Sequence, residues 1–444
     1  MNMNELDSPD NEAAPAKSES SSPYSLFRNR DFSLFLIGRF IASFGQQMLS
    51  VAVDWEIYER TRSALALGFV GLAQMIAIVL CTLPAGYVAD NFNRKRVVLL
   101  MTLIISAAAA GLAGLSAFNA PVACVYLCLL IHASARTMLW PANASFLPHL
   151  VTRQQLPRAI TFSSATFQMA GMLGGTAGGV VIWLTHRAWV VYATTAMTSL
   201  IFFVLISFIR REHKVAARQP FSFTHLGAGL HFILGNKIIL GVITLDLFAV
   251  LLGGATSLFP IYAKDILQGG PQGLGILTAA MPIGAVVCAF ILAHRPPLQK
   301  AGRSMLLAVG AFGVATIIFG VANQNCFGMA IPNGVWFWVA FLMMVICGGV
   351  DNVSVVVRQS LVQLLAPDEK RGRVSAINSL FIGTSNELGG FESGFVAWLF
   401  GKAVGHTNAT GAIWSVSLGG LGTVLVVLCV AWMWPEIRRY GKLA

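Results

Sequence analysis

The sequence predicts an all-α polytopic membrane protein with twelve transmembrane helices in two pseudo-symmetric six-helix bundles. Hydrophobic residues make up 56% of the 444 residues and charged residues only 11%, so the chain carries more apolar surface than a soluble core needs. Twelve separate apolar stretches reach the length of about 20 residues that spans a bilayer. Landmarks in the first half also recur in the second half at a nearly constant spacing.

The expected helices follow one another along the chain with short connections. In order, they cover residues 33–58, 65–89, 97–117, 121–146, 158–184, 189–209, 237–263, 273–294, 304–322, 335–361, 374–400 and 410–434. We expect residues 1–32 to be a disordered cytoplasmic tail, because they begin with a polar, Ser-rich segment that lacks the apolar core of a signal peptide. The basic run RREHK opens residues 210–236, which predict a cytoplasmic linker with a short interfacial helix. The predicted domains are therefore bundles over 33–209 and 237–434, with a cytoplasmic tail over 435–444.

Lysine and arginine residues predict the orientation in the membrane. With both termini inside, the outer loops hold only Arg60, Arg62, Arg187, Lys264 and Lys402. The inner loops hold Arg94, Lys95, Arg96, Arg153, Arg158, Arg210, Arg211, Lys214, Arg218, Arg295, Lys300, Arg303, Lys370, Arg371 and Arg373. The positive-inside rule therefore predicts two cytoplasmic ends. The same rule accounts for the net charge of +11, so no nucleic-acid partner is needed to explain it.

A repeat relates the two halves of the chain. The segment from residue 29 to 39 aligns with the segment from 236 to 246 at an offset of 207 residues, which matches Arg39 with Asp246. At an offset of 215 residues, Arg136 matches Asp351, and the glycines of the fifth helix match those of the eleventh. Parallel repeats and charged residues inside the membrane are both typical of transporters.

The connection between the second and third helices reads GYVADNFNRKRVVL. Its Gly86, Asp90, Arg94 and Arg96 have the spacing of a loop signature, G-x-x-x-D-x-x-G-R-K/R, and the segment resembles that of the major facilitator superfamily. Asn93 stands where the signature has glycine, and asparagine tolerates a left-handed turn. An ordinary positively charged inner loop is the alternative interpretation.

The resemblance implies that this loop latches the two halves together on the cytoplasmic side. Its partner would be the start of the eleventh helix near Arg373–Ser375, with Asp368 or Glu369 available to the arginines. The equivalent loop of the second half has Pro297 in place of the aspartate, so the latch would be one-sided.

The fifth helix contains the small-residue segment AGMLGGTAGGVV. Small residues allow another helix backbone to approach closely. The segment resembles the exporter-associated signature of the same superfamily, although Gly175 replaces its proline. Tight helix packing and a directional role in export both remain open for the helix-packing glycines Gly171, Gly174, Gly175, Gly178 and Gly179.

The whole chain resembles the enterobactin-exporter-like and macrolide-efflux-like branch of the superfamily. The strings that carry the resemblance are SALALGFVGL, FLPHLVTRQQLPRA, LFPIYAKDIL and RGRVSAINSLFIGTSNELGGFESG. The branch implies a secondary transporter, and we expect it to be a monomer in the bacterial cytoplasmic (inner) membrane. It would export a siderophore or an amphipathic drug-like molecule by alternating access, coupled to protons and without a cofactor.

Five buried charged residues are candidates for the gate and for proton coupling. Arg39 and Arg136 lie in one bundle, and Asp246 and Asp351 lie in the other. We expect these arginines to pair with these aspartates when the cytoplasmic side is closed, because an unpaired charge in a membrane is costly. Pairing within each bundle is the alternative. Asp246 and Asp351 would exchange protons as the arginines approach or leave, and Glu387 on the eleventh helix is a rival proton carrier.

Neutral polar residues on the cavity-lining helices are candidate substrate contacts. They are Gln46, Gln47, Asn352 and Asn378, although interhelical hydrogen bonds would explain them equally well. His132 is a fifth candidate, with a hydrogen-bonded packing role as the alternative. At the end of the first helix, Asp54, Glu56 and Glu59 are expected to form a solvated acidic rim, with attraction of protons or cations to the mouth as the alternative.

Other classes of protein fit the sequence less well. No nucleotide-binding loop, Gly-x-Ser-x-Gly or His-Glu-x-x-His motif is present, which argues against an enzyme or an ATP-driven pump. Cys124 and Cys128 lie one turn apart, but no histidine or carboxylate completes a metal set, so no metal is expected. Uptake of a nutrient or a lysolipid by the same fold is the remaining alternative, because a fold does not decide substrate or direction.

Overall fold

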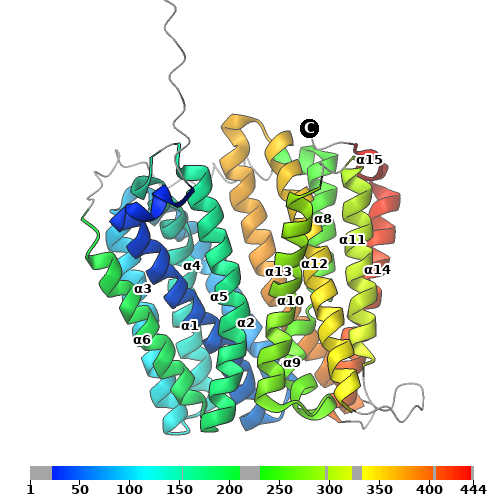
Figure 1. Ribbon diagram of the computed structural model, residues 1–444. Helices are drawn as coiled ribbons and strands as arrows, with labels where there is room; N and C mark the ends of the chain where they lie inside the picture. Colours follow the sequence, from blue (N-terminus) through cyan, green and yellow to red (C-terminus); the bar gives the residue numbers. More distant parts are fainter. Residues whose placement is uncertain are drawn as a thin grey trace, which may run out of the picture.

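The computed structural model describes residues 23–152, 154–210, 231–295, 299–322, 333–403 and 407–441. Within these ranges, twelve long helices form two bundles that stand side by side (Figure 1). The first bundle consists of α1 (Arg30–Thr61), α2 (Ala64–Asn91), α3 (Arg94–Ala117), α4 (Val122–Leu150), α5 (Leu156–Thr185) and α6 (Ala188–Ser207). The second consists of α8 (Lys237–Leu252), α10 (Gly270–Ala293), α11 (Ala301–Gly320), α12 (Asn333–Leu365), α13 (Asp368–Ala403) and α14 (Asn408–Met433).

Helix length and composition agree with a membrane protein. Eleven spans in the described chain are long and apolar enough to cross a bilayer. The 36-residue α13 is the twelfth long helix and stands beside the others, packed against α2, α8 and α14 (Figure 1). Its polar and charged residues explain why hydropathy alone does not mark it as a span. The predicted fold class is confirmed.

Both bundles begin with the same helix cap. The Asn29 side chain accepts hydrogen bonds from the main-chain N–H groups of Asp31 (3.1 Å) and Phe32 (3.4 Å), which starts α1. The Asn236 side chain accepts from those of Ile238 and Ile239 (both 3.1 Å), which starts α8. A side-chain oxygen at this position satisfies N–H groups that have no partner inside the helix. The two asparagines occupy aligned positions of the repeat, 207 residues apart.

The seventh span is interrupted. After α8 ends at Leu252, two glycines lead into the short helices η2 (Ala255–Leu258), α9 (Phe259–Ile261) and η3 (Tyr262–Ile266). A Cβ atom on Gly254 would lie 2.6 Å from the main-chain carbon of Gly389, so α13 passes directly against the break. Further along, the Tyr262 hydroxyl donates a hydrogen bond to the Gly320 carbonyl oxygen at 2.9 Å. Broken spans of this kind recur in transporter folds.

The hydrophobic cores of the two bundles merge on one side only. We call the side on which α1 begins and the short helix α15 (Pro435–Arg439) lies the terminal side, and the opposite side the far side (Figure 1). On the far side, one continuous core takes residues from both bundles, including Ile57 and Leu67 of the first and Tyr262 and Phe319 of the second. On the terminal side the cores are separate, one within the first bundle and two within the second. Among the described residues, the bundles therefore share one hydrophobic core on the far side and have separate cores on the terminal side.

Two glycine seams join the bundles on the far side, where α2 packs against α13 and α5 against α10. A Cβ atom on Gly394 would lie 2.7 Å from the Cα atom of Gly68, and one on Gly179 would lie 2.9 Å from that of Gly275. Gly68 matches Gly275 at the offset of 207 residues, and Gly179 matches Gly394 at 215. The two seams are therefore equivalent contacts. In each one, the second helix of one repeat packs against the fifth helix of the other repeat.

We expect Gly179→Ala to destabilise the protein, because the new methyl group meets main-chain atoms of α10 that cannot move aside. Overpacking of this kind costs about 1–3 kcal/mol. Gly114→Ala on α3 is the matched control, since nothing lies within 4 Å of an added Cβ atom there. Alanine at position 114 should leave the thermal midpoint of the purified protein in detergent unchanged or raise it. Equal midpoints for the two variants would contradict the seam.

Candidate functional site

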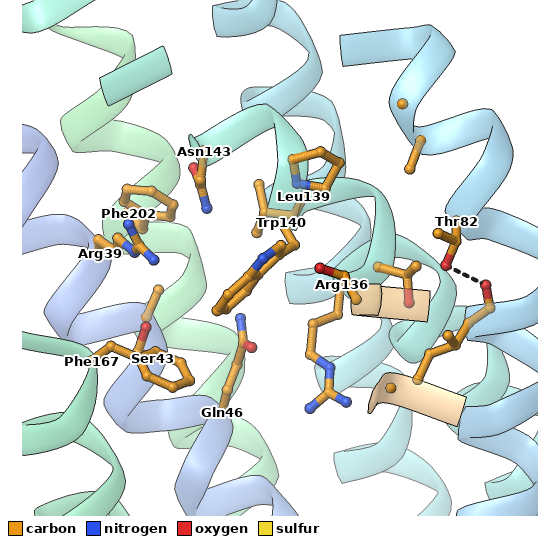
Figure 2. A pocket seen from close by; sticks show the side chains of 18 of the residues that line it. Arg39, Ser43, Gln46, Thr82, Arg136, Leu139, Trp140, Asn143, Phe167 and Phe202 are labelled. Atoms are coloured by element: carbon orange, nitrogen blue, oxygen red, sulfur yellow. Dashed lines mark hydrogen bonds between the residues drawn. The ribbon is translucent and has the colours of Figure 1, made fainter. Parts of the chain in front are cut away.

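A cavity of about 550 Å³ lies between the two bundles in the terminal half of the protein. Its walls come from α1, α2, α4, α5, α6 and α13, and Figure 2 shows the side chains that face it. The lining residues are Arg39, Ala42, Ser43, Gln46, Gln47, Ile78, Thr82, Ala85, Gly86, Arg136, Thr137, Leu139, Trp140, Pro141, Asn143, Phe167, Phe202, Ser379 and Gly383. These residues include two arginines and three aromatic side chains but no carboxylate.

Arg39 lies on one wall of the cavity. Its Nη1 donates a hydrogen bond of 2.6 Å to the Ser163 hydroxyl of α5, and its guanidinium carbon lies 6.0 Å from the centre of the Trp140 ring. Figure 2 shows the Trp140 indole between the guanidinium groups of Arg39 and Arg136. Trp140 is 59% exposed in spite of its size, and it lines the cavity. Neither Trp140 nor Ser163 was anticipated from the sequence, although Trp140 follows Arg136 by one helical turn.

Arg136 connects the cavity to the other bundle. Its Nη2 donates a hydrogen bond of 3.1 Å to the Gln74 side-chain oxygen of α2. The same nitrogen lies 3.8 Å from the Glu387 carboxylate of α13, an ion pair that crosses the interface. The sequence singled out both charged residues without predicting that they meet.

Asp246 pairs within its own bundle. Its carboxylate contacts the Arg358 guanidinium of α12, and both side chains are almost completely buried, at 9% and 4% exposed. Asp351 has no ion pair among the described residues. The expected pairs of Arg39 and Arg136 with Asp246 and Asp351, which were predicted for the state closed on the cytoplasmic side, are likewise absent from the described part of the chain.

The candidate substrate contacts occupy different places. Gln46 and Gln47 line the cavity, and Gln46 points into it in Figure 2. His132 is buried on α4 away from the lining, and its Nε2 atom has no hydrogen-bond partner among the described residues. Asn352 and Asn378 also lie outside the lining, although Ser379 next to Asn378 belongs to it.

The basic residues at the start of α3, just after the loop between α2 and α3, contact their own bundle. Gly86 lines the cavity, and the Arg94 guanidinium contacts the His149 ring of α4. Arg96 is exposed, and its main-chain N–H donates to the Asn93 side chain at 3.3 Å. The expected left-handed turn at Asn93 is wrong: its φ is −61°, and it caps α3 instead.

The latch itself falls partly outside the described chain. The side chains of Asp90, Asp368, Glu369 and Arg373 are not among those that the structure describes, and neither is Pro297. The pairing of the loop with the start of α13 stays a prediction.

The glycines of α5 form two packing faces. Gly174 and Gly178 face α1, where added Cβ atoms would lie 2.8 Å from the Gln47 side chain and 2.9 Å from the Met48 carbonyl oxygen. Gly175 and Gly179 face α10. Gly171 has neighbours from both sides, at 3.6 Å in α1 and 3.7 Å in α10. Helix α5 therefore packs tightly between its own bundle and the other one.

A polar cluster ties the bundles together at the far-side mouth. The Tyr58 hydroxyl donates to the Asp265 carboxylate, Glu59 forms an ion pair with Lys264, and Arg62 lies 3.8 Å from Asp265. The Asn408 side chain adds a hydrogen bond of 2.5 Å to the Arg62 carbonyl oxygen. We call these residues the far-side cluster. The repeat in the sequence pointed to this contact, because Tyr58 and Asp265 are 207 residues apart and thus occupy equivalent positions.

The expected acidic rim at the end of α1 is wrong in part. Glu59 is exposed, but Glu56 is only 7% exposed and pairs with Arg60 at 3.2 Å. Asp54 is partly buried as well. The α1 helix continues to Thr61, so both residues lie inside the packed bundle and not on its rim.

Comparisons with known proteins agree with this architecture. The profile of the Major Facilitator Superfamily matches residues 35–390. The enterobactin exporter EntS of Salmonella typhi is 24% identical over 414 residues, which cover 93% of this chain and 94% of that protein. The enterobactin exporter EntS of Citrobacter koseri is 24% identical over 420 residues, 93% of each chain.

Solved transporter structures share the fold. A bacterial homologue of the human lysosomal transporter Spinster, in an inward-facing and unoccupied conformation, has a TM-score of 0.69 at 14% identity over 93% of this chain and 97% of that one. The POT family transporter PepTSo has a TM-score of 0.71 at 12% identity, over 92% and 98% of the two chains. At these identities the likeness concerns the fold alone.

The buried pair of Asp246 and Arg358 gives a testable expectation for stability. Removing one partner leaves an uncompensated buried charge, which costs about 3–5 kcal/mol. We therefore expect Asp246→Asn and Arg358→Gln each to lower the thermal midpoint strongly. The double variant should recover most of the loss, because no charge is then left alone. A double variant as unstable as the sum of the two single variants would contradict the pairing.

Proposed function

Because the chain belongs to the Major Facilitator Superfamily, we propose that it is a secondary active transporter that exports a siderophore or an amphipathic drug-like molecule by alternating access, driven by protons. The observation that carries the proposal is the one-sided cavity. It lies between two bundles that share a core on the far side and have separate cores on the terminal side. A cavity reachable from one side of the membrane at a time is what alternating access requires.

The terminal side would be the cytoplasmic side. It carries the basic residues of the connections, among them Arg94, Lys95, Arg210, Arg295 and Lys300. The positive-inside rule places such residues in the cytoplasm. The structure would then represent the inward-facing conformation, with the substrate cavity accessible to the cytoplasm.

The chemistry of the cavity favours a substrate that is both aromatic and anionic. Arg39 and Arg136 can bind carboxylate, phenolate or similar oxygen anions, while Trp140, Phe167 and Phe202 provide apolar faces. The volume lies within the range of about 300–1,000 Å³ that holds drug-sized ligands. A siderophore as substrate is further supported by the resemblance to enterobactin exporters.

Export requires that the far side opens and the terminal side closes. Opening would separate the far-side cluster and both glycine seams. Closing would bring the loop of Asp90 and Arg94 to the start of α13. Asp351 has no ion pair among the described residues, so it is available to an arginine of the first bundle in that state.

Transport assays in inverted membrane vesicles test the proposal. We expect an acidic vesicle lumen to drive accumulation of an anionic catecholate siderophore, and collapse of the proton gradient to abolish it. Accumulation that ignores the gradient would contradict proton coupling. Loss of preloaded substrate from the vesicles down the same gradient would favour the alternative, uptake of a nutrient or a lysolipid.

Substitutions in the cavity test the substrate class. Arg39→Gln should raise the KM for the anionic substrate about tenfold or more, since a hydrogen bond to a charged group is worth about 1.5–3 kcal/mol. Trp140→Ala should raise it several-fold, since an aromatic contact is worth about 0.5–1.5 kcal/mol beyond its buried area. Arg303→Gln, which removes an exposed arginine of α11, is the matched control and should transport normally. If a cationic aromatic compound is carried equally well by the wild-type protein and by Arg39→Gln, the assignment of an anionic substrate is wrong.

A further inference from the structure

At the terminal end of the cavity, α1 and α4 hold two polar side chains at the same level. Phe35 of α1 packs edge-on against Phe146 of α4, with ring centres 5.7 Å apart. One turn after Phe35, the Arg39 guanidinium carbon lies 6.0 Å from the centre of the Trp140 ring of α4. Asn143 lies between Trp140 and Phe146 in α4, about one turn from each. These two contacts between the helices therefore place Asn143 at the level of Arg39.

Asn143 is a buried polar residue without a partner. Its side chain lines the cavity although the residue is only 8% exposed. Neither atom of its amide group has a hydrogen-bond partner within the described part of the chain. Figure 2 shows the side-chain nitrogen pointing towards the space that Arg39 and Trp140 border. A buried amide without a partner costs free energy, because it has lost hydration and gained no hydrogen bond. A ligand in this space would supply the missing bond.

Arg39 has donors left for the same space. Its Nη1 donates to the Ser163 hydroxyl, but a guanidinium carries five N–H groups in a planar fork. The bond to Ser163 and the Trp140 ring hold the guanidinium in one orientation, so little further ordering is needed when a ligand binds. The described lining residues include no carboxylate that would compete for these donors.

We propose that Arg39 and Asn143 together bind an aromatic substrate group that carries two neighbouring oxygen atoms. One oxygen accepts from the guanidinium and the other from the Asn143 amide. The ring that carries them lies against Trp140, because both donors border the exposed indole. The inference rests on the proposed function for the role of the cavity as a substrate site, and it adds Asn143 to the residues that determine specificity.

Two isomeric probes test the requirement for neighbouring oxygens. Both are N-benzylbenzamides with two ring hydroxyl groups that are not next to the amide. One probe has the hydroxyl groups on adjacent carbons, as in catechol, and the other has them one position further apart, as in resorcinol. We expect calorimetric titration of the purified wild-type protein in detergent to give a Kd about two- to tenfold lower for the catechol probe, the effect of one additional hydrogen bond.

Asn143→Leu removes the amide and keeps the shape of the side chain. It should raise the Kd of the catechol probe to that of the resorcinol probe and leave the Kd of the resorcinol probe unchanged. The thermal midpoint of the ligand-free variant should stay the same or rise, because the amide that is lost had no partner. Arg39→Gln should weaken the binding of both probes, since the guanidinium donates to an oxygen of either one.

Thr102→Val is the matched control. Thr102 of α3 is 1% exposed, and its hydroxyl group also has no partner among the described residues, but it lies outside the cavity lining. This variant likewise removes a buried polar group of the first bundle. It should keep the wild-type preference for the catechol probe.

The outcomes separate this inference from the proposed function. Equal Kd values of the two probes for the wild-type protein would overturn the paired site. A preference that survives in Asn143→Leu, or a strong fall in the ligand-free thermal midpoint of that variant, would overturn it as well. If vesicles still accumulate an anionic siderophore under a proton gradient in these cases, the proposed function stands and the substrate is held by other residues. A preference that depends on Asn143, without transport in vesicles, would keep the binding site and refute the proposed export.

Discussion

Main-chain contact at the two glycine seams is the constraint on which the rest of the structure depends. Glycine at positions 68, 179, 275 and 394 lets helices of different bundles approach until their backbones touch. That approach allows the cores to merge on the far side, whereas the cores of the described residues stay separate on the terminal side. The cavity exists because the contact is made at one end only.

Charge placement follows the same division. Inside a bundle, a charged residue pairs with another residue of the same bundle, as Asp246 does with Arg358. Where the bundles meet, partners come from opposite bundles, as in Arg136 with Glu387 and Lys264 with Glu59. Pairs of the first kind can persist through a movement of the bundles, whereas pairs of the second kind must break.

Much of the architecture was predictable from hydropathy and from the repeat, because both act over whole helices. The Asn29 and Asn236 caps show that even local detail follows the alignment. The partner of each charged residue was harder to predict from the sequence. Asp54 looked like part of a solvated rim because its sequence neighbours are acidic, but α1 continues to Thr61 and packs Asp54 partly inside the bundle. Matched positions predict symmetry, but an ion pair depends on helix rotation and depth, which sequence spacing leaves open.

The contact between Tyr58 and Asp265 has a consequence for the origin of the fold. These residues occupy equivalent places in the two repeats and touch each other, so they lie beside the axis that relates the repeats. In an ancestral homodimer of identical units, this place would bring two tyrosines or two aspartates face to face, and two aspartates would repel. A donor opposite an acceptor therefore requires two copies that differ in sequence at this position.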